Sequence, residues 1–169
     1  MKKFEKIAGI IILVSSVLIF ITFFLPVFES KTFSDPVTPS MIIFGKQYST
    51  SVANQAFAYQ FYKYWPLALT YFLPIIPAGA FWLIQLIRVN KPIKYVIYFI
   101  TLLSFSLGIL FFITTPKSAA FVRVDVQSNL LYLKNYNFIP TIWGILTLVF
   151  ASLGALSSGA ALVKEIIEE

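Results

Sequence analysis

Few residues in this chain carry reactive side chains, and their types exclude most catalytic chemistry. The sequence has no Cys and no His, so it lacks a thiolate nucleophile, an iron–sulfur ligand and the side chain most used for zinc, haem and general acid–base work. Groups left for a surface reaction are Glu29, Asp35, Arg123 and Asp125. Since no nucleophile or base is close to Arg123 and Asp125 in sequence, we expect an ion pair or solvated charges there. We therefore predict no enzyme activity, no metal and no cofactor.

The composition indicates a small integral membrane protein. Of 169 residues, 59% are hydrophobic and 12% are charged, and the mean hydropathy is +0.84; soluble domains are roughly 45–50% apolar and 25% charged. The formal charge of +6 is interrupted by long uncharged stretches and forms no continuous basic face, which argues against nucleic-acid binding. Lys far outnumbers Arg, and Phe, Ile, Tyr and Asn are common, which indicates an AT-rich prokaryotic genome.

Four segments are long and apolar enough to cross a bilayer, which needs about 20 residues. They cover residues 7–28, 66–87, 93–115 and 138–163 and make one domain over 1–169. The first follows two lysines, as the core of a signal peptide would. Its apolar run is longer than such a core, and residues 24–28 offer no small-x-small cleavage site, so we predict a permanent span.

Basic residues predict the orientation by the positive-inside rule. On one side they are concentrated in three short segments, and on the other they are spread over the loops 29–65 and 116–137. We therefore expect a multi-pass protein of the cell membrane with both termini in the cytoplasm. The residues that carry this prediction are Lys2, Lys3, Arg88, Lys91 and Lys94.

The interior of the predicted spans carries no ionisable side chain, which argues against proton-coupled transport. Pro74 and Pro77 each remove a backbone donor and predict a kink in the second span. A static packing kink is the favoured interpretation, and a broken helix that lines a transport site is the alternative. Gln85, the most polar residue of the spans, is interpreted as an interhelical hydrogen-bonding group rather than a ligand contact.

Small residues dominate the end of the fourth span. Ala151, Ala155 and Gly159 recur every four positions, the small-xxx-small pattern that lets two helix backbones approach closely. This face is predicted to be a helix-packing interface. Its partner is either another span of this chain or a second protein.

The two loops are expected to be folded. Residues 41–44 and 47–50 flank Gly45-Lys46 and predict a hairpin, and the aromatic spacing over 52–64 is interpreted as a short interfacial helix. Residues 120–126 alternate with a period of two, and 130–133 would return antiparallel to them. Because an isolated hairpin is marginal in water, we predict one small sheet built from both loops.

The predicted fold is an all-α membrane protein, a four-transmembrane-helix bundle with a small extracytoplasmic β-sheet from the two outer loops. This order resembles the claudin-type tetraspan layout in topology. The first-loop Trp and paired Cys motif of that family is absent from the chain. Neither its disulfide nor its paracellular function is therefore implied.

These properties favour a non-catalytic role. The first hypothesis is an accessory or scaffold subunit that contacts the lipid bilayer and other membrane-protein subunits through the outer sheet or the fourth helix. The alternative is a homo-oligomeric channel or passive carrier, with hydroxyl-bearing faces along a path. The sequence leaves the partner, any transported species, the oligomeric state and the order of the helices open.

Overall fold

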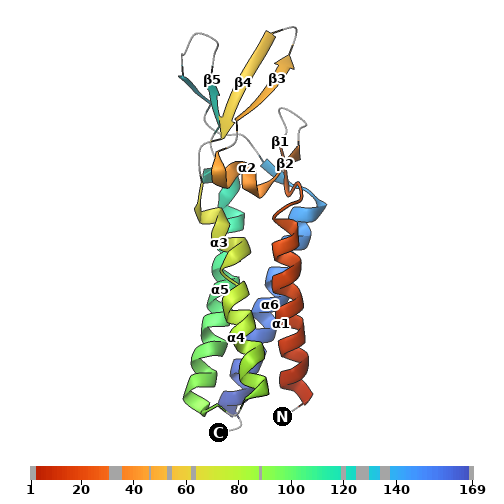
Figure 1. The fold of residues 1–169 in the computed structure, drawn as a ribbon, viewed down its shortest axis with the longest axis vertical. Coiled ribbons are helices and arrows are strands. Elements are labelled where there is room, and N and C mark those ends of the chain that lie inside the picture. The colour runs from red at the N-terminus through yellow and green to blue at the C-terminus, as the bar shows by residue number, and fades with distance from the viewer. Residues whose placement is uncertain are drawn as a thin grey trace.

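Four helical spans form an upright bundle, with both chain termini at one end and the strands at the other (Figure 1). The structure is a computed structural model that describes residues 3–30, 36–45, 47–52, 55–61, 64–87, 89–118, 121–124, 130–133 and 138–167. The long helices are α1 (Lys3–Thr22), α5 (Lys91–Ser118) and α6 (Ile142–Ile167), and the second span consists of α3 (Pro66–Phe72) and α4 (Ile75–Leu86). Each of the four is long and apolar enough to cross a membrane.

The interior of the bundle follows a heptad pattern. The buried residues of α6 alternate at spacings of three and four, a spacing typical of helices packed at small crossing angles. They are Gly144, Thr147, Ala151, Gly154, Ser158, Ala161 and Glu165. The same spacing on α5 buries Tyr98, Thr101, Phe105, Gly108, Phe112 and Thr115. We call the α6 set the α6 seam; it packs between α1 and α5.

Two expected spans are shorter at one end than predicted. The first span ends at Thr22 rather than Phe28, and the fourth begins at Ile142 rather than Phe138. Phe28, at the end of the first predicted span, belongs to strand β1 (Phe28–Ser30), and the start of the fourth predicted span forms strand β7 (Phe138–Pro140). The two strands pair antiparallel with each other. A helix through Pro26 or Pro140 would lack the backbone N–H that proline does not have. Pairing of the strands satisfies the backbone groups next to these prolines instead.

The strands form two small sheets at the end opposite the termini (Figure 1). The first has the order β2-β1-β7, with β2 at Pro36–Val37. The second has the order β3-β4-β5-β6 and comprises Gln47–Val52, Gln55–Phe61, Phe121–Val124 and Leu130–Leu133. The antiparallel return of residues 130–133 on 121–124 is confirmed, and strands from both loops share one sheet.

Two local predictions in the first loop were wrong. Residues 41–44 do not form a strand, because they belong to helix α2 (Pro39–Phe44), which starts with Pro39 in its first turn. Gly45 ends this helix in the left-handed conformation (φ 68°) and its N–H bonds the carbonyl of Met41. Within the predicted helix 52–64, the described residues 55–61 form strand β4, which pairs with β3 on one side and β5 on the other.

Candidate functional site

Polar residues from four helices meet at the termini end of the bundle. Glu5 comes from the first turn of α1, Gln85 from the last turn of α4, Lys94 and Tyr95 from the start of α5, and Glu165 from the end of α6. We call these five residues the polar cluster. Gln85, Lys94 and Tyr95 lie close together in sequence, on either side of the short connection between α4 and α5. Glu5 and Glu165 are 70 or more residues away from their partners in this group, so the packing of the bundle brings them here.

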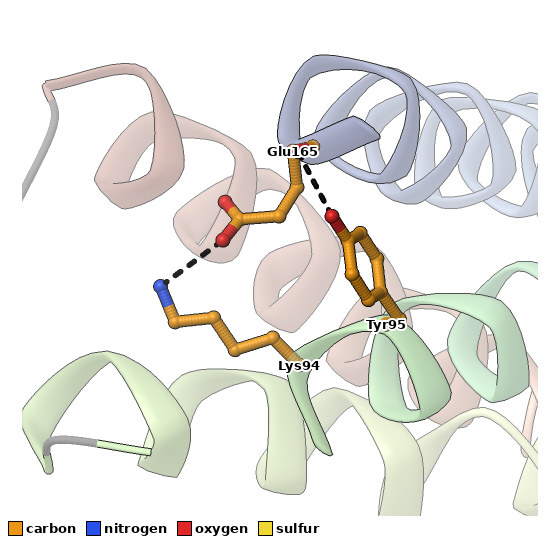
Figure 2. Close-up of polar contacts among 3 residues, drawn as sticks. All are labelled: Lys94, Tyr95 and Glu165. Carbon is orange, nitrogen blue, oxygen red and sulfur yellow. Dashed lines mark hydrogen bonds and ion pairs between the residues drawn. The ribbon is translucent and has the colours of Figure 1, made fainter. Parts of the chain in front are cut away.

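The centre of the polar cluster is an ion pair between α5 and α6. The Nζ atom of Lys94 lies 3.7 Å from Oε1 of Glu165, and the hydroxyl of Tyr95 donates a 3.1 Å hydrogen bond to the backbone carbonyl of Glu165 (Figure 2). The Glu165 side chain is 11% exposed and that of Lys94 is 23% exposed. A carboxylate this buried is costly unless it is paired. The pair therefore ties the last turn of α6 to the first turn of α5.

A second contact joins α4 to α1. The Nε2 atom of Gln85 donates a 2.8 Å hydrogen bond to the backbone carbonyl of Glu5, the interhelical contact expected of this residue. Gly9 makes room for it, because a Cβ at this position would lie 2.9 Å from the Cδ of Gln85. The amide therefore lies across the first turns of α1.

Gln85→Ala is expected to lower the free energy of unfolding in detergent by about 1 kcal/mol, since interhelical hydrogen bonds in membranes contribute about that much. Gly9→Ala should have a similar effect, because its methyl group displaces the same amide. The free energy of unfolding of the double variant should then be little lower than that of either single variant. Additive losses in equilibrium unfolding would show that Gly9 and Gln85 act independently.

A half-enclosed cavity of about 440 Å³ opens beside the polar cluster. Its polar lining consists of Glu5, Gln85, Lys94 and Tyr98. The ring of Tyr98 is held by stacking on Phe81 at a centroid distance of 4.6 Å. This volume falls within the range of small-ligand sites in proteins.

Several hydroxyl groups inside the bundle bond to helix carbonyls or to one another. Thr22 and Thr147 join α1 to α6 through a 2.8 Å hydrogen bond between their hydroxyls. Thr70 donates to the carbonyl of Gly108 at 3.0 Å and joins α3 to α5. The buried hydroxyl of Tyr71 lies near Thr147 but makes no hydrogen bond of good geometry among the described residues. These hydroxyls act as packing groups between spans.

The proline-containing segment divides the second span. Leu73 and Pro74 separate α3 from α4, and Pro77 lies in the first turn of α4. Pro74 has no N–H to offer to the carbonyl of Thr70, and Pro77 has none for Leu73. The hydroxyl of Thr101 on α5 approaches the carbonyl of Pro77 at 3.4 Å.

The small residues of α6 are buried to different degrees. Ala151 is buried in the α6 seam, whereas Ala155 and Gly159 are only partly buried. A Cβ at Gly159 would contact Leu102 at an ordinary 3.7 Å, but at Gly154 it would lie 2.5 Å from Cζ of Phe105. Of these two glycines, Gly154 is therefore the one packed tightly against α5, and the four-residue repeat had not singled it out.

The remaining residues from the sequence analysis are scattered. Glu29 is exposed on β1, Arg123 belongs to β5, and Asp35 and Asp125 lie outside the described residues. Lys91 and Lys94 begin α5 and Lys3 begins α1, whereas Lys2 and Arg88 are outside the described part. Among the residues that the structure describes, no group of three acids could hold a metal ion.

No protein-family model, curated protein or solved structure matches this chain. The chemistry of the described side chains is therefore the basis on which a function is proposed. The features that bear on it are the polar cluster with its cavity, the hydrogen-bonded interior and the two sheets at the opposite end.

Proposed function

We propose that this protein is a non-catalytic accessory or scaffold subunit of a larger membrane complex. In this proposal the bundle anchors the chain in the cell membrane with both termini in the cytoplasm. The two sheets then lie on the extracytoplasmic side, in the claudin-type order, and the four-stranded sheet contacts the partner. The concentration of lysines near the termini end supports this orientation.

The distribution of polar groups in the spans carries the proposal. At exposed positions of the four described spans the side chains are apolar, apart from Lys6 and Lys91 near the termini end and Ser106. In the interior, the hydroxyls of Thr70, Thr101 and Ser158 donate to carbonyls, and those of Thr22 and Thr147 bond to each other. A path between copies of this chain would need polar residues on the outer faces. This distribution favours an anchor over the channel or carrier.

The experiment is purification of the tagged full-length protein in mild detergent from its native membrane, followed by native mass measurement and identification of bound proteins. We expect a stoichiometric foreign membrane protein. In a variant whose residues 121–133 are replaced by a Gly-Ser linker of equal length, the partner should be lost while the bundle retains its thermal midpoint. That variant removes two strands of the four-stranded sheet and no part of the spans.

A matched control replaces Val163 with Ala on the exposed face of α6, and it should keep the partner. Retention of the partner by the linker variant would exclude the sheet as the docking surface. A homo-oligomer that conducts ions in liposomes would overturn the subunit proposal in favour of the channel.

A further inference from the structure

The cavity at the termini end carries both signs of charge. Glu5 and Lys94 line it from different helices, and Glu165 lies just behind Lys94 at 3.7 Å. Lys94 attracts an anionic group and Glu5 attracts a cationic group, so a ligand with charge of one sign would use only one of the two. A ligand that carries both an ammonium and a phosphate matches this arrangement.

The rim of the cavity is apolar. Leu86 and Ile87 line it and are 67% and 62% exposed, respectively. A small soluble ligand would leave these side chains uncovered, whereas the acyl chains of a lipid would cover them. The charged and amide residues of the lining, Glu5, Gln85 and Lys94, belong to the first or last turn of three spans. That is the level of lipid headgroups rather than of the hydrocarbon.

We propose that this cavity binds the headgroup of a zwitterionic aminophospholipid, with the phosphate at Lys94 and the ammonium at Glu5. Lys94 has three N–H donors and directs one side of its ammonium at Glu165, so the others are available to phosphate oxygens. Gln85 bonds the backbone carbonyl of Glu5, which leaves the Glu5 carboxylate to the ligand. This lipid site does not depend on the proposed docking of a protein partner.

The test is native mass spectrometry of the full-length protein, titrated with phosphatidylethanolamine, phosphatidylglycerol and phosphatidylcholine that have identical acyl chains. We expect phosphatidylethanolamine to bind about tenfold more tightly than the other two lipids. This is the gain in affinity that one charge-assisted hydrogen bond provides. Phosphatidylglycerol has no ammonium, and the methyl groups of choline remove its N–H donors.

Two variants locate the site. Glu5→Gln should abolish the preference for phosphatidylethanolamine over phosphatidylcholine, and Lys94→Gln should weaken all three phospholipids. Glu5→Gln keeps the test valid if Lys94→Gln fails to fold, because the Glu5 carbonyl, not its carboxylate, holds α4. Lys6→Gln is the matched control, since Lys6 is an exposed charge beside Glu5 that does not line the cavity; it should bind like wild type.

Three results would overturn the proposal. The first is equal binding of the three lipids by the wild-type protein, and the second is an unchanged lipid preference in Glu5→Gln. The third is displacement of the lipid by soluble phosphoethanolamine at equal concentration, which would identify a soluble ligand in place of a lipid.

Discussion

Alanine at Gly144 or Gly154 is expected to lower the free energy of unfolding of this protein by about 2 to 3 kcal/mol. At Gly144, a Cβ would overlap the backbone carbonyl oxygen of Val27 and lie 3.0 Å from the Cβ of Pro140. At Gly154, it would lie 2.5 Å from the ring of Phe105, which is fully buried between α5 and α6. At Gly144 the backbone at Val27 has to shift, and at Gly154 the buried ring of Phe105 has to shift, so neither methyl group fits without displacing its neighbours.

Two other glycines provide matched controls. Gly79 in α4 has nothing within 4 Å of its Cβ position, and a Cβ at Gly159 would make only an ordinary contact. Gly79→Ala and Gly159→Ala should therefore be neutral or stabilising by up to about 1 kcal/mol, because alanine is the better helix former. Equilibrium unfolding in detergent compares all four variants. If Gly159→Ala lowered the free energy of unfolding as much as Gly154→Ala, the tighter packing around Gly154 would be contradicted.

Removing the carboxylate of Glu165 should lower the free energy of unfolding by about 2 kcal/mol. In Glu165→Ala, the largely buried ammonium of Lys94 has lost the carboxylate that neutralises it. An unpaired buried charge destabilises the folded state more than a buried ion pair does. Lys94→Met removes the other charge of the ion pair and should lower the free energy of unfolding by a similar amount. Both losses are measured by equilibrium unfolding in detergent.

A double variant separates the ion pair from simple packing. Lys94→Met combined with Glu165→Met removes both charges and should recover much of the stability lost in either single variant. Lys91→Ala, an exposed lysine in the same turn of α5, serves as the control and should change stability by less than about 0.5 kcal/mol. If the two single losses add in the double variant, the two charges do not stabilise each other.

Hydropathy alone was sufficient to predict the four helices that are long and apolar enough to cross a membrane. Each of the four helices overlaps a segment predicted from its uncharged apolar run, because a span has to satisfy its backbone groups internally and the helix is the simplest way. An even number of spans also puts both termini at one end (Figure 1). The sheet shared by the two loops followed from the period-two pattern of 120–126 and the instability of an isolated hairpin.

The choice between helix and strand in the loop regions depended on tertiary pairing. Residues 55–61 have their aromatic residues at every second position, a strand signal that was interpreted with a helical period. Phe28 and Phe138 lie at the ends of apolar runs, and their strands exist because each is the other's partner. Local propensity does not contain that information, since the pairing joins residues far apart in the sequence.

Composition, charge and hydropathy thus determined the four apolar helices and the common end of the termini. The tertiary structure decided which small residues of α6 make the closest contacts and brought Glu5, Gln85, Lys94 and Glu165 together. The reason is physical. In a lipid environment the packed and lipid-facing sides of a helix are both apolar, so periodicity of hydropathy does not reveal which side faces the neighbouring helix.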